Sequence, residues 1–354
     1  MFLMTTVNYE LIILARETMG LTQAELADML YIKQSTMSKI EHGLLAFPIS
    51  LTDKLVEILP YPKSFFYQDW KPVRVEGHYR KKMSLSVKSV KEYVSKMTMA
   101  ERHFISIIDS VEMPDLNYPK WNVNVDGSPS LCAQHLREFW KIPKGRIDNL
   151  TDLIENNGIP IIELYLGQMD GFTTLSKCGT PIIFINRSRP GDRDLLTKAH
   201  ELFHVIAHFG QVISSDRDID KEATEFASEL LFPEKNARQD LSKINLPKLV
   251  DLKKYWRVSM GSMIMKAKQL SLITQDQYSY LWKQMGAMGY RTKEPIETHR
   301  EVATLFQEML TTYLENFAYS KEEFEKVLQV PSSLIDEWYF NRHPSKLKII
   351  RKIG

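Results

Sequence analysis

The sequence predicts a multidomain protein: an all-α N-terminal domain, an α+β domain in the middle of the chain and a helical C-terminal region. Three features support this fold class. Apolar residues recur at helical spacing through the first 70 residues and again after residue 300. Between them, two short isoleucine-rich runs bounded by Gly and Pro, IPIIELYL and TPIIFIN, are typical of strands within a helix-rich segment. A chain of 354 residues is long enough for two or three such domains.

Composition and cysteine usage narrow the class of protein. Hydrophobic residues make up 44% of the chain and charged residues 25%, the ordinary balance of a globular protein. No apolar run approaches the roughly 20 residues of a membrane helix, and the N-terminus lacks the basic segment of a secretory signal. Cys132 and Cys178 are too few for a disulfide framework and lack metal-binding spacing. We therefore expect a cytoplasmic protein with free thiols and no membrane contact.

Residues 9–45 predict short helices joined by tight turns. The stretch LTQAELADML opens on Thr22 as N-cap, with Glu25 three residues later, which is a capping box. Gly20 is placed to end the preceding helix, and Gly43 to end the following one, YIKQSTMSKIEHG. Two short helices with a tight turn between them form a helix-turn-helix.

The stretch LTQAELADMLYIKQSTMSKIEHG also resembles the phage-repressor/Cro (XRE) family, over about residues 8–65. The resemblance implies a recognition helix beginning at Gln34, and an ion pair between Arg16 and Glu41. It also implies binding of double-stranded operator DNA by a homodimer. Two positions depart from the family: Tyr31 replaces the usual turn Gly, and Lys33 the usual capping Ser. The residues implied to contact DNA are Gln34, Ser35, Ser38 and Lys39 at base edges and Gln23 at phosphate, with Gln23 also placed against Gln34.

Charge is unevenly distributed around this domain. Residues 1–70 hold 5 Lys/Arg and 8 Asp/Glu, a net charge of −3, whereas residues 71–100 hold 8 Lys/Arg and 2 Glu, a net charge of +6. The last 13 residues add five basic groups and no acid. Affinity for the DNA backbone must therefore come from local placement, from the basic segment or from dimerisation. A long amphipathic helix is predicted to begin near Ser86, and a solvated helix face is the simpler interpretation of its charges.

AHELFH contains the sequence His-Glu-x-x-His. On a helix, His200 and His204 lie one turn apart on one face and can present two imidazoles to one metal ion. Glu201 beside them is placed to take a proton from the attacking water and later give it to the leaving amine. This spacing predicts a catalytic zinc site, which needs a third protein ligand and one open position.

The third ligand is predicted to come from the next helix. His208, four residues after His204, would point elsewhere from the same straight helix, and the position six residues after His204 is Gly210. Of the glutamates in DIDKEATEFASELLFP, Glu222 lies closest to the edge of the apolar face. We therefore expect Glu222 as the ligand, completing two His and one Glu, with His208 as a supporting residue around the zinc ligands or an oxyanion donor.

The stretch DRDLLTKAHELFHVIAHFG, followed by KEATEFASELLFP, resembles the ImmA/IrrE metallopeptidase family, over roughly residues 120–295. The resemblance implies a zincin-like fold, Zn²⁺ on His200, His204 and Glu222, and Glu201 as catalytic acid/base. It also implies cleavage or inactivation of a repressor, and some fused members are antitoxins. Phe203 departs from the small residue usual at its position, so we expect it to crowd the neighbouring strand or the substrate groove.

These features predict four segments and two alternative functions. The segments are a DNA-binding domain (1–70), a basic helical linker (71–120), a zinc metallopeptidase domain (121–295) and a helical C-terminal region (296–354). The first function is a DNA-binding regulator whose peptidase domain cleaves a repressor, a partner protein or itself. The alternative is a non-proteolytic autorepressor or antitoxin of a toxin–antitoxin or mobile-element system, with the zincin domain as a partner-binding scaffold. A helical dimerisation module that no longer binds DNA is the alternative for residues 1–70.

Overall fold

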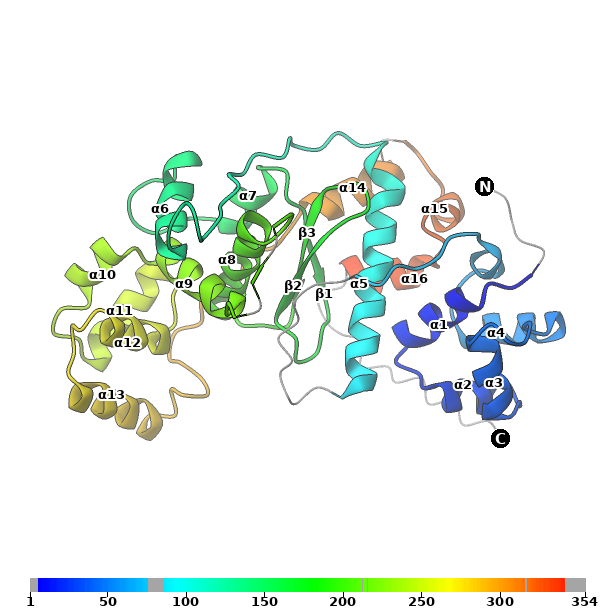
Figure 1. Ribbon diagram of the computed structural model, residues 1–354, viewed down its shortest axis with the longest axis horizontal. Helices are drawn as coiled ribbons and strands as arrows, with labels where there is room; N and C mark the ends of the chain where they lie inside the picture. Colours follow the sequence, from blue (N-terminus) through cyan, green and yellow to red (C-terminus); the bar gives the residue numbers. More distant parts are fainter. Residues whose placement is uncertain (1–5, 76–85, 212, 215, 316, 341–354) are drawn as a thin grey trace.

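The computed structural model describes residues 6–75, 86–211, 213, 214, 216–315 and 317–340. The basic tail, together with residues 76–85 of the expected linker, lies outside the described residues. The molecule is elongated, with the N-terminal helices at one end and a small sheet near its middle (Figure 1). The other end is a helical lobe of α10 (Glu234–Asp240), α11 (Leu246–Trp256), α12 (Met260–Gln269) and α13 (Gln275–Ala287).

The N-terminal unit is the predicted helix-turn-helix. Thr22 caps α2 and Glu25 completes the capping box, as expected. Gly20, at the end of α1, has a φ of +63°, a conformation that Gly adopts without strain. Its helices are α1 (Tyr9–Thr18), α2 (Gln23–Met29), α3 (Gln34–Glu41) and α4 (Thr52–Ile58).

The turn before α3 keeps its geometry despite the two unusual residues. Tyr31 adopts the left-handed conformation, with a φ of +58°, that Gly usually supplies. Its ring lies 3.3 Å from the Lys54 ammonium, a cation–π contact. Lys33 occupies the N-cap position of α3 and makes no side-chain capping bond. The turn is therefore formed without the usual Gly and Ser.

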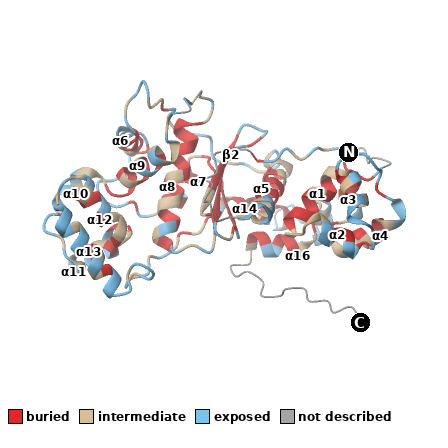
Figure 2. Cartoon of the chain, turned by 60° about the horizontal axis from the view of Figure 1, so that its bottom comes forward, coloured by how far each residue is buried: buried red, intermediate tan, exposed pale blue. Residues whose placement is uncertain are grey.

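The long helix α5 (Val87–Ile108) begins where the sequence predicts, with Ser86 as its N-cap. The basic residues Lys88 and Lys91 are exposed, which agrees with a solvated helix face, while ten of the 22 residues of the helix are buried. Its apolar face packs against α1 on one side and against the sheet on the other. Figure 2 shows buried residues along α5, between the N-terminal helices and the sheet.

The sheet has three strands in the order β1 (Ile161–Leu164), β3 (Pro181–Asn186) and β2 (Gly171–Leu175). β1 pairs with β3 in parallel, and β2 pairs with β3 antiparallel. β1 and β3 are the two predicted isoleucine-rich strands. β2 was not predicted, because Gly-Phe-Thr-Thr-Leu has neither a continuous apolar run nor strict alternation.

The two faces of the sheet belong to two hydrophobic cores. Side chains alternate between the faces, so Ile162 and Phe184 lie in the core shared with α5, while Ile161 and Ile183 lie in the other core. The second core holds α6 (Pro129–Phe139), α7 (Leu150–Glu155), α8 (Gly191–Ala207) and α9 (Ile219–Leu231). β1 and β3 are buried on both faces, which explains their nearly continuous apolar sequences.

The C-terminal helices complete the first core. They are α14 (Leu305–Glu315), α15 (Lys321–Leu328) and α16 (Ser332–Ile335), followed by a π turn (Asp336–Phe340). α14 and α15 contact α5, and the π turn contacts β1. Ser64 of the N-terminal unit donates a hydrogen bond to Gln329 at 2.8 Å. Within the described part of the chain, no helix is long and apolar enough to cross a membrane.

Candidate metal centre and nucleic-acid interface

The helix α8 presents His200 and His204 to one point in space. The two residues lie one turn apart, and their Nε2 atoms are 3.3 Å from each other. The His200 side chain borders the cleft described below, whereas His204 is buried. Both predicted histidines therefore converge.

The third converging group is Asp220, from the first turn of α9. Its Oδ1 lies 3.5 Å from Nε2 of His200, and the three ligand atoms all lie within 4.8 Å of one another. Zn–N and Zn–O bonds of about 2.0–2.2 Å in a tetrahedron separate neighbouring ligands by about 3.3–3.6 Å. The two separations measured from Nε2 of His200 match this range and the third is no greater than 4.8 Å, so two imidazoles and one carboxylate can converge on a zinc ion.

Glu222, the residue expected in this third position, lies outside the group. It is two residues after Asp220, about 200° around the helix, and faces away from His200. Its oxygens accept hydrogen bonds from Arg217, one of them at 2.9 Å, and lie 3.3 Å from Nε2 of His208. Burial opposes ionisation, but the hydrogen bonds from Arg217 and His208 hold the pKa of Glu222 below its usual value.

Each histidine of the centre is held through its Nδ1 atom. Nδ1 of His204 lies 2.7 Å from Nδ1 of His208, which in turn contacts Glu222. Nδ1 of His200 lies 3.4 Å from the Thr224 hydroxyl. Such contacts fix the orientation of ligating imidazoles and leave Nε2 toward the metal. His208 thus lies between His204 and Glu222.

Glu201 lies beside the two histidines and is mostly buried. The hydroxyl of Thr173 on β2 donates to Oε2 of Glu201 at 2.7 Å. Gly171 permits this close packing, because a Cβ there would lie 2.6 Å from Cγ2 of Thr197 and 3.1 Å from Cγ of Glu201. Burial raises the pKa of Glu201, which suits a group that must both accept and donate a proton.

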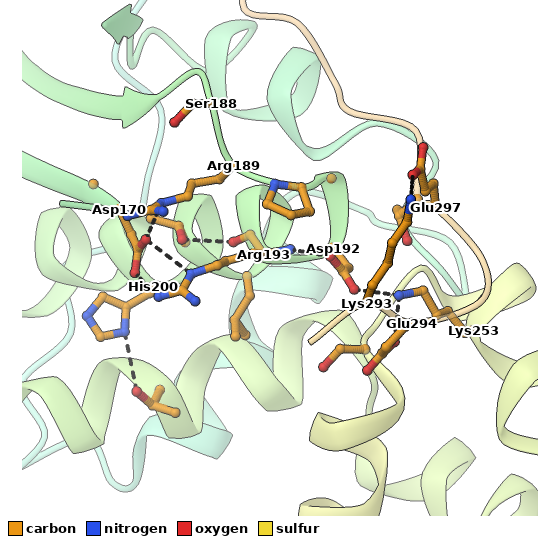
Figure 3. A pocket seen from close by; sticks show the side chains of 18 of the residues that line it. Asp170, Ser188, Arg189, Asp192, Arg193, His200, Lys253, Lys293, Glu294 and Glu297 are labelled. Carbon is orange, nitrogen blue, oxygen red and sulfur yellow. Dashed lines mark hydrogen bonds and ion pairs between the residues drawn. The ribbon is translucent and has the colours of Figure 1, made fainter. Parts of the chain in front are cut away.

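The centre opens into a cleft of about 1050 Å³. Figure 3 shows its charged walls: Arg193 forms an ion pair with Asp170 at 2.6 Å, near His200. On the opposite wall Lys253 bridges Asp192 and Glu294, each at 2.6 Å. Residues 290–294 and 296–298 line the side away from β2. The cleft is large enough for several residues of an extended peptide.

A second candidate surface lies at the other end of the molecule, on α3. Gln34, Ser35 and Lys39 are exposed there, and Ser38 is partly exposed. Gln34 donates to the side chain of Gln23 at 2.7 Å, which is the pairing that the family resemblance implies.

The implied structural ion pair lies behind this surface. Nε of Arg16 and Oε1 of Glu41 are 2.6 Å apart, and both side chains are buried. Glu41 also accepts a hydrogen bond from Gln23 at 2.9 Å. These contacts connect the buried pair to Gln23 and through it to the start of the recognition helix.

The two surfaces define a class of protein, a helix-turn-helix protein that carries a metallopeptidase-like α+β domain. Comparison with known families agrees: the helix-turn-helix family matches residues 12–66, and the IrrE N-terminal-like domain, from a peptidase family, matches residues 154–268. The chain thus joins an XRE-type helix-turn-helix domain to an ImmA/IrrE-like domain. No curated protein matches the chain.

Three residues of the site were not anticipated from the sequence: Asp220, Thr224 and Thr173. Asp220 and Thr224 share the face of α9 that carries Ala223 and Ala227, two small buried residues. Small residues let two helices approach closely, so this face must meet α8. That pattern could have identified Asp220. Thr173 lies on the strand that was not predicted.

Proposed function

We propose that the chain is a zinc metallopeptidase joined to its own DNA-binding domain. In this proposal His200, His204 and Asp220 hold Zn²⁺, and Glu201 is the catalytic acid/base. The observation that carries the proposal is the convergence of these three ligand atoms beside Glu201 in an open cleft. We infer a protein substrate, either a repressor, a partner protein such as a toxin, or the chain itself.

The residues of the site suit peptide hydrolysis. When bound, a zinc ion would polarise the scissile carbonyl and lower the pKa of the attacking water. Glu201 would take the proton of that water and pass it to the leaving amine. Thr173 would hold the Glu201 carboxylate toward the cleft. Arg193, which is paired with Asp170 near His200, is one of the exposed cations of the cleft and would meet a substrate carbonyl or carboxylate.

The DNA-binding domain would direct this activity to an operator. Gln34, Ser35, Ser38 and Lys39 would face base edges, and Gln23 would face phosphate. Their exposure on α3 and the Gln34–Gln23 hydrogen bond support these roles. A homodimer would read a two-fold symmetric site.

Glu201→Gln tests the peptidase role. The variant should keep its zinc and its fold, because Glu201 is not a ligand, and cleavage should fall by about 10²–10⁴-fold, the usual contribution of a general acid/base. Zinc content and fragment masses are measured on the purified chain, alone and mixed with the product of the neighbouring gene. Glu297→Gln, which removes an exposed acid of the same cleft, is the control and should cleave normally. If the wild type binds zinc but cleaves neither itself nor the mixed protein, the result would instead favour the non-proteolytic regulator.

A further inference from the structure

The start of α5 lies against the DNA-reading end of the helix-turn-helix. Nζ of Lys88 is 2.9 and 3.0 Å from the two carboxylate oxygens of Glu25 on α2. Nζ of Lys91, one turn further along α5, is 3.8 Å from Oε1 of Glu17 on α1. Both lysine side chains remain about half exposed, at 46% and 52%. The two lysines lie outside the residues that match the helix-turn-helix family.

The two lysines and Gln23 border one hollow. A pocket of about 320 Å³ is lined by Thr22 and Gln23 of the DNA-reading domain and by Lys88 and Lys91 of α5. Gln23 is bonded to Gln34, the first residue of the recognition helix, so the hollow adjoins the exposed face of α3. A duplex lying on that face would bring its sugar–phosphate backbone to the hollow.

Charge also favours a phosphate there. Residues 1–70 carry a net charge of −3, so the domain by itself repels DNA. Among the described residues, three cations and two carboxylates line the hollow: Arg16, Lys88 and Lys91 against Glu17 and Glu41. Lys88 neutralises Glu25, the capping-box carboxylate that would otherwise face the backbone.

We propose that α5 is part of the DNA-binding surface, with Lys88 and Lys91 each neutralising a backbone phosphate beside Gln23. This inference rests on the proposed DNA-binding function of the helix-turn-helix. α5 also packs on the sheet that carries the candidate metal centre, so the same helix would meet the DNA backbone and support the peptidase-like domain.

The salt dependence of DNA binding tests this surface. Affinity of the full chain is measured between 50 and 200 mM salt, for a duplex selected from a random-sequence pool by the wild type and for a mixed-sequence duplex. Lys88→Ala and Lys91→Ala should each lower the slope of log affinity against log salt by about 0.9, on both duplexes. Across this salt range the wild type should therefore lose roughly threefold more affinity than either variant.

Two further variants serve as a control and as a test of the competing carboxylate. Lys235→Ala removes an exposed lysine of α10, at the far end of the molecule, and should leave the slope unchanged. Glu25→Gln keeps a capping-box side chain, removes the competing carboxylate and should strengthen binding. Slopes for Lys88→Ala and Lys91→Ala equal to that of the wild type would overturn the proposed surface. A wild type that binds neither duplex would contradict the DNA-binding function itself. That outcome differs from equal slopes, which would contradict only the role of α5.

Discussion

Phe203, the residue between Glu201 and His204 that departs from the family pattern, lies in the core and not in the cleft. Its side chain is fully buried. The ring packs on Phe226 of α9, with centroids 4.9 Å apart, and on His208, with centroids 5.1 Å apart. It is not among the residues that line the cleft. The expectation that Phe203 crowds the substrate groove is therefore wrong, and its role is to join α8 to α9.

Truncating Phe203 should accordingly cost stability. Phe203→Ala should lower the free energy of unfolding by about 3–5 kcal/mol, because it leaves a cavity between two packed helices. Denaturant unfolding measures this change. Leu196→Ala, on the same helix but lining the cleft, is the control and should cost clearly less. A Phe203→Ala chain that is as stable as the wild type would show that the ring does not support the core.

For single residues, the sequence predicts well which side chains one helix brings together. It predicts less well which side chains meet when two helices pack. His200, Glu201 and His204 follow from helical spacing alone. The third carboxylate depends on which face of α9 meets α8. The edge of the apolar face led to Glu222, whereas the small residues Ala223 and Ala227 mark the face that meets α8 and carries Asp220.

At the scale of elements, local signals predicted well and packing did not. The predicted helix starts at Thr22 and near Ser86 agree with the observed N-caps of α2 and α5, because a capping side chain bonds only to its own helix. The amphipathic pattern of α5 predicts that one face is buried but not which elements cover that face. Its partners are α1, the sheet and the C-terminal helices, and no local rule places these together.

The junction of α7, β1 and α14 contains a buried acid, Glu155. Burial raises the pKa of Glu155 to about 7, although backbone N–H groups of Thr304 and Leu305 donate to its carboxylate. The raised value means that the folded chain holds more protons than the unfolded chain between about pH 4.5 and 7. The contribution of Glu155 to the free energy of unfolding is therefore present at low pH and is lost as the pH rises through about 7.

Glu155→Gln should remove this pH dependence. In the wild type, the contribution of Glu155 to the free energy of unfolding should change by on the order of 3 kcal/mol between about pH 4.5 and 7. In the variant, the contribution of this position should be nearly constant. Thermal unfolding at a series of pH values gives the comparison. Glu308→Gln, on the exposed side of α14, should retain the wild-type slope. If Glu155→Gln also retains that slope, another group is responsible.

In the whole molecule, one hydrophobic core runs from the DNA-reading helices through α5 to the sheet. Leu11 of α1, Phe104 of α5 and Phe184 of β3 belong to this one cluster of buried residues (Figure 2). The C-terminal helices pack into it, and the Tyr339 hydroxyl lies 2.6 Å from Nδ1 of His103 on α5. The DNA-binding domain is thus attached to the peptidase-like domain by packing and not by a bare linker.

The identity of the metal ligands is the most direct test of the proposed zinc centre. Zinc affinity and stoichiometry are measured by chelator competition for the wild type, Asp220→Ala and Glu222→Gln. The wild type should bind a single zinc ion, and Asp220→Ala should lose it. Glu222→Gln should keep the stoichiometry with roughly 10–100-fold lower affinity, because Glu222 acts only through His208. A wild type without zinc, or zinc kept in Asp220→Ala and lost in Glu222→Gln, would contradict the centre described here.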